Sequence, residues 1–341
     1  MLDMRAIAMA ASVVMGLAPT PSAPAGYRLV GTIKLGGDGG WDYLAFDPPS
    51  RRLFVSHGTH VVVVDADTRA VVGDIPDTPG VHGIAIAGDL GRGFISNGRS
   101  ASATIFDLKT LGRIGEVKTG ENPDAILYDR ASGRVFTFNG RSGDATAFDA
   151  ARGTVAGTVP LGGKPEFAVA DDKGRVYVNI EDKSEIVALD SRSLQVEGRW
   201  PLKPCQEPSG LAFDREHGRL FSVCRNNLMA VVDTVSGRVI TTLPIGSGVD
   251  GAAFDPATRL AFSSNGEGTV TVVHEDSPEA FRVVETVKTQ RGARTLALDP
   301  KTHRIFLSTA EFGPAPAPTA EAPRPRPSIV PGTFLVLVLG R

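Results

Sequence analysis

A unit of about 42 residues recurs seven times along the chain and constrains its fold more than any other feature. The units start at dipeptides spaced 40, 42, 42, 43, 41 and 44 residues apart: Trp41-Asp42, Val81-His82, Pro123-Asp124, Pro165-Glu166, Pro208-Ser209, Val249-Asp250 and Ala293-Arg294. This period is typical of propeller blades with four strands each.

Each unit repeats the same order of short apolar runs. A first run such as YLAFD or GLAFD is followed by a turn rich in Pro, Gly and Arg, and then by a second run such as RLFVS or RVFTF. A third run ends in Asp, as in VVVVD, and a fourth is rich in Val or Ile. Short β-runs separated by turn residues indicate antiparallel sheets, and no amphipathic helical pattern competes with them. The sequence therefore predicts an all-β, seven-bladed β-propeller with four-stranded antiparallel blades.

The two ends of the repeat region complement each other. Tyr27–Leu35 resembles a fourth strand, whereas the last unit supplies only three, ending with Thr333–Leu339. We expect the N-terminal strand to close the last blade, because closure removes two exposed sheet edges. Residues 26–341 then form a single propeller domain, and a proline-rich loop at 313–332 is inserted in its last blade. That loop is either a solvated surface segment or a lid or partner-docking strap.

Residues 1–25 have the pattern of a secretory signal peptide. Arg5 precedes an apolar run from Ala6 to Ala18, and a small-residue segment ends at Ala25. The run is too short to cross a bilayer comfortably, and no later segment reaches about 18 uninterrupted apolar residues. We expect a cleaved, exported protein, periplasmic or secreted, without a membrane span; the alternative is an uncleaved anchor.

Charge and cysteine usage narrow the partners and the redox chemistry. Lys and Arg number 36 against 38 Asp and Glu, so no basic field is available for a nucleic acid. Cys205 precedes the first strand of the fifth unit, and Cys224 ends its second strand, so both lie at one end of the blade. In an oxidising compartment we expect them to form a disulfide rather than a metal site or a nucleophile.

The start of strand one and the end of strand two of each blade meet at one mouth of the channel. A turn near Pro49–Ser50 pairs Leu44 with Val55 and therefore Asp42 with His57. The inner mouth positions are Asp42, His82, Asp124, Glu166, Ser209, Asp250 and Arg294. The second-ring positions, at the ends of the second strands, are His57, Asn97, Asn139, Ile180, Cys224, Asn265 and Thr309. We predict a polar, mostly acidic pocket there.

Two chemistries fit these residues. In one, a divalent cation such as Ca²⁺, Mg²⁺ or Zn²⁺ is held through Asp42, Asp124, Glu166 and Asp250. In the other, His57 or His82 is the general acid or base, Asp42 or Glu166 orients it, and Arg294 stabilises negative charge. The predicted substrate-binding residues are Trp41, Asn97, Asp124, Asn139, Asp250, Asn265, Glu267 and Glu311.

A structural role for the inner carboxylates is an equal alternative. Each could cap unpaired backbone amides of the next blade, because carboxylates accept such hydrogen bonds well. Other charged residues of the mouth loops, such as Glu207 and Arg225, are expected to form a solvated rim. The chain has no GxSxG, Walker, HExxH, CxxC or CxxCH motif.

The second strands also carry a family resemblance. RVYVN at 175–179 and TFN at 137–139, each followed by a strand that ends in Asp, resemble the YVTN-repeat or YncE-like family of seven-bladed propellers. That family includes periplasmic and surface binding proteins and oxidoreductase subunits. Related propellers include lactonases, muconate-cycloisomerase-like enzymes and streptogramin lyases, which work at the channel mouth with His, Glu or Arg, sometimes with a divalent metal. The resemblance implies the location of a site, for which His57, His82, Glu166 and Arg294 are candidates.

From these features we expect a hydrolase or lyase that acts on a small, lactone-like or oxygen-rich substrate at the mouth. The alternative is a non-catalytic module that binds a metal ion, a cationic ligand or a protein partner on the same face.

Overall fold

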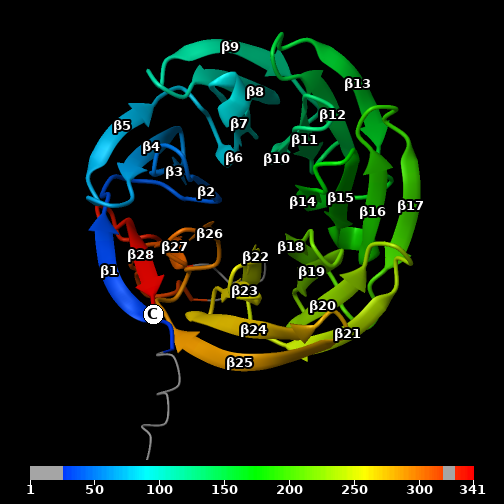
Figure 1. Cartoon of the computed structure of the whole chain (residues 1–341). Coiled ribbons are helices and arrows are strands. Elements are labelled where there is room, and N and C mark those ends of the chain that lie inside the picture. Colours follow the sequence, from blue (N-terminus) through cyan, green and yellow to red (C-terminus); the bar gives the residue numbers. More distant parts are fainter. Residues whose placement is uncertain (1–25, 318–326) are drawn as a thin grey trace, which may run out of the picture.

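Seven sheets stand in a ring in the computed structural model, which describes residues 26–317 and 327–341. The predicted signal peptide (1–25) and the middle of the proline-rich loop (318–326) lie outside the described residues. Each sheet has four antiparallel strands, which follow one another from the centre of the ring to its rim (Figure 1). The predicted seven-bladed β-propeller is confirmed.

The blades are numbered in chain order, and each begins with its innermost strand. Blade 1 contains β2 (Leu44–Asp47), β3 (Arg52–His57), β4 (His60–Asp65) and β5 (Val71–Ile75). Blade 2 contains β6 (Val81–Ala87), β7 (Arg92–Asn97), β8 (Ser102–Asp107) and β9 (Arg113–Lys118). Blade 3 contains β10 (Pro123–Asp129), β11 (Arg134–Asn139), β12 (Asp144–Asp149) and β13 (Val155–Pro160). Blade 4 contains β14 (Pro165–Ala170), β15 (Arg175–Ile180), β16 (Glu185–Asp190) and β17 (Val196–Pro201).

The remaining blades follow the same plan. Blade 5 contains β18 (Pro208–Asp214), β19 (Arg219–Cys224), β20 (Leu228–Asp233) and β21 (Val239–Pro244). Blade 6 contains β22 (Val249–Asp255), β23 (Leu260–Asn265), β24 (Thr269–Ser277) and β25 (Ala280–Lys288). Blade 7 contains β26 (Leu296–Asp299), β27 (Arg304–Thr309), β28 (Leu335–Gly340) and β1 (Arg28–Lys34). Two short 3-10 turns occur in the described chain, at Gly88–Leu90 and Glu181–Lys183, and no helix there is long and apolar enough to cross a membrane.

A buried aromatic ring at the middle of every second strand forms the repeating core. The seven residues are Phe54, Phe94, Phe136, Tyr177, Phe221, Phe262 and Phe306. The Phe54 ring packs with Ile84 and Ile95 of the next blade, so the hydrophobic clusters cross blade boundaries. Burying a side chain of this size contributes roughly 1.5–3 kcal/mol, and packing between blades repeats that contribution around the ring.

The N-terminal strand closes the ring as predicted. β1 pairs with β28, from Arg28 opposite Gly340 to Lys34 opposite Leu335. A second link joins blades 1 and 7, where the Arg51 guanidinium donates two hydrogen bonds, of 2.8 and 2.6 Å, to the buried Asp299 carboxylate. Closure therefore combines main-chain pairing with a bidentate ion pair.

The strand register is partly as predicted. Phe46 lies opposite Leu53 and Leu44 opposite Val55, as predicted. The β2–β3 ladder ends at the Leu44–Val55 pair, so the predicted pairing of Asp42 with His57 does not form. In blades 2 to 6 the register shifts near the start of the first strand; Pro123, for example, and not Asp124, lies opposite Asn139. This irregularity decides which side chains enter the channel.

Cys205 and Cys224 form a disulfide, with their Cα atoms 5.7 Å apart. Both residues are fully buried against Leu202, Leu211 and Ala230. The bond ties the segment before β18 to the end of β19 at the mouth of blade 5. It closes a chain segment with a sequence separation of 19 residues.

Replacing both cysteines by alanine should lower the free energy of unfolding by about 3 kcal/mol, because a loop of this length loses closure entropy in the unfolded chain. Guanidinium unfolding of the oxidised protein and of the double variant measures the difference. Reduced wild-type protein serves as the control and should resemble the variant. Two reactive thiols in unreduced, denatured wild-type protein would contradict the bond.

Candidate functional site

A cavity of about 840 Å³ opens at the mouth of the channel, on the face where the first strands begin. Six carboxylates and four basic side chains line it: Asp42, Asp124, Glu166, Glu181, Glu207 and Asp250, with Lys164, Arg225, Arg291 and Arg294. Its less polar wall is formed by Trp41, Tyr43, Val249, Phe312, Pro327 and Ile329. The cavity is thus polar and mostly acidic, with an aromatic side.

The main chain at the inner mouth positions is held by the neighbouring blade. The Ser96 hydroxyl donates to the carbonyl of Asp124, and the Ser264 hydroxyl donates to the carbonyl of Arg294. The Asn179 amide donates to the carbonyl of Ser209 in the same way. Each donor stands one residue before the second-ring position of its own second strand. The backbone is therefore fixed without help from the mouth side chains.

The inner carboxylates make their hydrogen bonds to other side chains. Within the described residues, no backbone N–H donates to the carboxylates of Asp42, Asp124, Glu166 or Asp250. Their hydrogen-bond partners are side chains: His82 for Asp42, Lys164 and Glu181 for Glu166, and Arg294 for Asp250. A role as backbone caps, the alternative raised from the sequence, has no support in these contacts. Their charges face one another and the cavity instead.

A chain of charged contacts runs along one side of the cavity. His82 Nδ1 lies 2.5 Å from Asp42 Oδ2 and 3.7 Å from Asp124 Oδ1. Arg294 Nε donates to Asp250 at 2.6 Å, and its Nη2 lies 3.8 Å from Asp42 Oδ1. Asp42 therefore stands between an imidazole and a guanidinium, and three carboxylates share these two partners.

Burial and mutual repulsion shift the protonation of this group. Desolvation, followed by the charge of Asp42, raises the pKa of Asp124 to about 7 and that of Asp250 to about 6. Burial opposes the charged form of His82, but its hydrogen bond to Asp42 and the charge of Asp124 raise its pKa overall. Burial and the surrounding carboxylates hold the pKa of Tyr43, at the floor of the cavity, well above its usual range. Protons and negative charges therefore coexist here near neutral pH.

A second charged group comes from blades 4 and 5. Lys164 Nζ lies 2.5 Å from Glu166 Oε1 and also contacts Glu181. Burial, and then the hydrogen bond with Glu181, raise the pKa of Glu166 to about 9, while Glu166 and Lys164 lower the pKa of Glu181 against its own burial. The two carboxyl groups thus hold one proton and one negative charge, which Lys164 balances. Arg225 pairs with Glu207 at 2.9 Å beside them.

These charged residues occupy positions that are glycine elsewhere in the repeat. Lys164 and Glu207 precede the first strands of their blades, where four other blades have Gly40, Gly80, Gly248 and Gly292. Glu181 and Arg225 follow the second-ring positions, where four other blades have Gly58, Gly98, Gly140 and Gly266. Lys164, Glu181 and Tyr43 were not among the predicted site residues, and Glu207 and Arg225 were expected to form a solvated rim. Comparing blades position by position would have found four of these five.

Trp41 belongs to both the core and the cavity wall. Its ring stacks on Phe334 with centroids 5.4 Å apart and packs against Phe312 at 6.0 Å. Its buried Nε1 has no hydrogen-bond partner within the described residues. Phe312 forms an isolated bridge with Ile329, so the two ends of the proline-rich loop meet at this wall.

The structure places the second-ring residues away from the cavity. The amides of Asn97, Asn139 and Asn265 donate to hydroxyls on their own third strands, at Thr104, Thr146 and Thr271. His57 stacks on Phe334, with centroids 4.3 Å apart, and burial followed by nearby His60 lowers its pKa. None of these predicted site residues lines the mouth cavity. The three asparagines stand in blades whose register shifts and bond within their own blades, whereas His57 packs on Phe334 in blade 1, which has no such shift.

Two further predicted substrate-binding residues, Glu267 and Glu311, also lie outside the cavity lining. Glu267 accepts hydrogen bonds from Ser247 and Thr269 in the mouth loops of blade 6. Glu311 is exposed, and its backbone N–H donates to the Thr333 hydroxyl. Of the predicted set, the cavity lining contains Trp41, Asp42, Asp124, Glu166, Asp250 and Arg294. His82 reaches it through its contact with Asp42.

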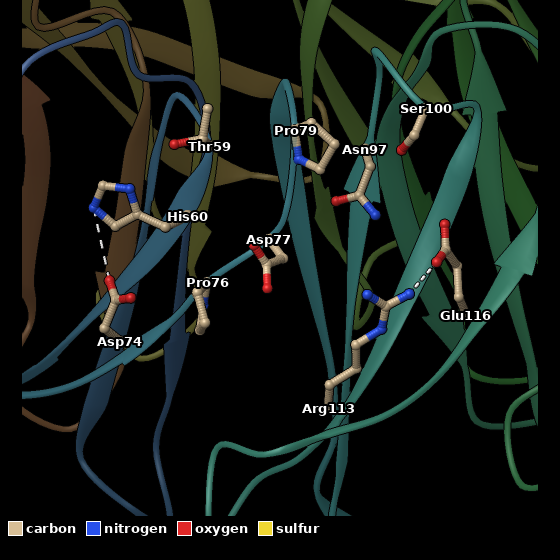
Figure 2. A pocket seen from close by; sticks show the side chains of 10 residues that line it. All are labelled: Thr59, His60, Asp74, Pro76, Asp77, Pro79, Asn97, Ser100, Arg113 and Glu116. Carbon is tan, nitrogen blue, oxygen red and sulfur yellow. Dashed lines mark hydrogen bonds and ion pairs between the residues drawn. The ribbon is translucent and has the colours of Figure 1, made fainter.

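A second hollow, of about 670 Å³, lies between blades 1 and 2 (Figure 2). Four of its five charged residues form two pairs: His60 Nε2 lies 3.7 Å from Asp74 Oδ1, and Arg113 contacts Glu116. Asn97 borders this hollow and not the mouth cavity. The hollow brings together exposed ion pairs and not the predicted acidic ring.

Comparison with known proteins identifies the fold alone. A chain of the Kuenenia stuttgartiensis hydrazine synthase superimposes with a TM-score of 0.67 and 16% identity over 85% of this chain and 96% of its own. A chain of a mitotic checkpoint complex superimposes with a TM-score of 0.75 and 12% identity over 100% and 99%. No family model and no curated protein matches the sequence. Membership of the YVTN-repeat family stays a prediction.

Asp42→Asn should lower the pKa of His82, because removing the carboxylate leaves burial as the dominant influence on the imidazole. In the wild type, the raised pKa stabilises the fold below the ordinary histidine pKa, and this contribution is lost as pH rises through the folded value. NMR titration of chelator-treated protein measures the shift, with the His82 signal assigned by His82→Gln. Asp74→Asn, which faces His60 instead, should leave His82 unchanged; an unaltered His82 pKa in Asp42→Asn would contradict the coupling.

Proposed function

We propose that this chain is an exported acid–base enzyme, a hydrolase or lyase, that acts on a small oxygen-rich substrate in the mouth cavity. The observation that carries the proposal is the Asp42–His82–Asp124 group, in which His82 Nδ1 lies 2.5 Å from one carboxylate and 3.7 Å from the other. Environments that separate the pKa values of neighbouring acids are typical of acid–base sites.

Asp124 is the proton-transfer group in this proposal. A carboxyl group with a pKa of about 7 exchanges protons readily near neutral pH, which suits a general acid or base. The neighbouring charges of Asp42 and His82 act on the pKa of Asp124 in opposite directions. Asp124 therefore takes a proton from an attacking water, or from a carbon beside a carbonyl, and returns it to the leaving oxygen.

Arg294 is the group that stabilises developing negative charge. Its guanidinium lines the cavity and is anchored on Asp250, so it needs no reorganisation during the reaction. The aromatic wall of Trp41 and Phe312 suits the carbon skeleton of a substrate. A cyclic ester fits this combination of an apolar wall, an acid–base carboxyl and a cation.

Two independent features support export. Residues 1–25 have the signal-peptide pattern, and the Cys205–Cys224 disulfide suits an oxidising compartment. We therefore propose a periplasmic or secreted location for the mature chain.

Asp124→Asn should lower the rate of lactone hydrolysis at least about 100-fold, because loss of one general acid–base group typically costs this much. Proton release from a panel of five- and six-membered lactones measures turnover by the wild type and the variant. Glu267→Gln is the matched control, since this carboxylate lies outside the cavity, and it should keep wild-type activity. Equal rates in Asp124→Asn, with unchanged melting temperature, would exclude this role, as would a wild type inactive on every lactone.

Cation binding at the same residues is a second candidate function. One ligand atom from each of Asp42, His82 and Asp124 lies within 4.8 Å of the others, which is compatible with a shared divalent ion. The residues fit such an ion because the carboxylates repel one another and the imidazole bonds only one of them closely. These three residues would hold the ion, and it would polarise a substrate oxygen.

If the mouth binds a metal, purified protein should contain near-stoichiometric metal there, and chelation should lower the melting temperature. Elemental analysis before and after chelation measures both effects. Asp124→Asn should abolish the metal content that belongs to the mouth, whereas Glu267→Gln should retain it. Protein purified without metal, and unaffected by added Ca²⁺, Mg²⁺ or Zn²⁺, would leave the acid–base enzyme as the only candidate.

A further inference from the structure

A second group of metal-ligating side chains lies on the opposite face of the ring, between blades 5 and 6. Asp214 and His217 stand in the turn between β18 and β19, and Glu275 lies near the end of β24. His217 Nδ1 is 2.7 Å from Asp214 Oδ2 and 3.3 Å from Glu275 Oε1. One ligand atom from each residue lies within 4.8 Å of the other two. This face is far from the mouth, because each first strand begins at the mouth and ends here.

Glu275 is the unusual member of this group. Its side chain is 0% exposed, and within the described residues neither carboxylate oxygen accepts a hydrogen bond. Burying an ionised carboxylate without a partner is costly, so natural proteins pair such groups or coordinate metals with them. Desolvation, and then the charge of Asp214, raise the pKa of Glu275 to about 7. The Glu275 carboxylate is aimed at His217 and Asp214.

The fold does not require a carboxylate at position 275. The residue's backbone N–H donates to the carbonyl of Arg259, and the corresponding residue of five other blades donates to the same turn position. None of them is charged: four are small and buried, namely Ala66, Ala150, Ser191 and Thr234, and the fifth is Leu108. Blade 6 thus replaces a small buried side chain by a glutamate that performs no task in strand pairing.

Position 217 departs from the repeat as well. In four blades the turn aspartate accepts a hydrogen bond from a hydroxyl three residues later, in the pairs Asp47–Ser50, Asp129–Ser132, Asp255–Thr258 and Asp299–Thr302. In blade 5 this hydroxyl is replaced by the His217 imidazole, which bonds Asp214 in its place. Two independent departures in adjacent blades therefore bring an imidazole and a second carboxylate to one turn aspartate.

The nearby arginines leave the group with excess negative charge. Arg219 contacts His217 only through its backbone carbonyl and directs its charge to Asp233 at 3.0 Å and Glu279 at 2.8 Å. Arg259 acts on Glu275 only through a weak long-range attraction, the smallest of the influences on that carboxyl. Two almost fully buried carboxylates therefore share one half-buried imidazole. A divalent cation would neutralise both.

We propose that Asp214, His217 and Glu275 form a site for a divalent transition metal of the Zn²⁺ class. Carboxylate oxygens and imidazole nitrogens are both zinc ligands, and three protein ligands leave a fourth position for water. Zn²⁺ takes the place of a proton on His217 Nδ1: a neutral ring then carries its one proton on Nε2, and an imidazolium releases one proton on binding. The ion joins the β18–β19 turn of blade 5 to β24 of blade 6 and stabilises the ring at that junction.

Zn²⁺ titration of the mature chain tests the site, with Asp124→Asn present throughout to remove the mouth cluster. In this background we expect one Zn²⁺ per chain by isothermal titration calorimetry and a rise in melting temperature on saturation. Adding Glu275→Ala or His217→Ser, the residue types found at these positions in other blades, should weaken binding at least tenfold and remove the rise. Co²⁺ should give visible absorption bands that the same variants lose.

The variants are chosen so that folding and binding are separated. Both introduce residues that the repeat already carries, and Glu275→Ala removes an unpartnered buried carboxylate, so the metal-free melting temperature should stay the same or increase. Absence of Zn²⁺ binding in Asp124→Asn overturns the proposal. So does binding of equal affinity in Glu275→Ala and His217→Ser. Loss of binding in either variant at an unchanged metal-free melting temperature supports it.

Discussion

The hydrogen bonds from second-strand polar side chains to the carbonyls of the next blade are the interactions on which the mouth depends. Ser96, Asn179 and Ser264 each hold the backbone of an inner mouth residue in the following blade. A side chain on the neighbouring second strand hydrogen-bonds to that backbone carbonyl, so the mouth side chain itself is not needed to stabilise the fold. Carboxylates, an imidazole and a guanidinium can therefore gather around one cavity without disrupting a ladder. Burial of the carboxyl groups, and then the charge of Asp42, raise the pKa values of Asp124 and Asp250.

The two sides of the mouth are built by different devices. On the side of blades 1 to 3, the charged residues stand at the inner mouth positions. On the side of blades 4 and 5, Lys164, Glu181, Glu207 and Arg225 replace glycines of the loops and extend the charged surface outward. The Asp214–His217–Glu275 group on the opposite face also arises where the repeat is broken. In a protein built of repeats, a residue that departs from its six counterparts without a structural reason is the best indication of a specific function.

Most of the fold was predictable from the sequence, and about half of the site was. The period and the turn residues determine seven blades, and the missing fourth strand of the last unit indicates closure by the N-terminal one. The inner positions from Trp41 to Arg294 follow from the starts of the first strands. The irregular register at Pro123–Asn139 and its equivalents could not be predicted from the alternation of apolar residues, so Asn97, Asn139 and Asn265 were assigned to the cavity although they bond within the blades. Long-range packing of Phe334 against both Trp41 and His57 was equally invisible, because it joins blade 1 to the last blade.

Closure by β1 also affects the order in which the blades fold. Hairpins within blades 1 to 6 join residues that are near in sequence, so they can form early and locally. The β1–β28 pairing joins the two ends of the described chain, and contacts of such long sequence separation slow folding. We therefore expect the ring to close last, with blade 7 and the aromatic wall of the cavity assembled in that final step. A chain interrupted before this step would hold six blades with native pairing and a mouth that lacks one side.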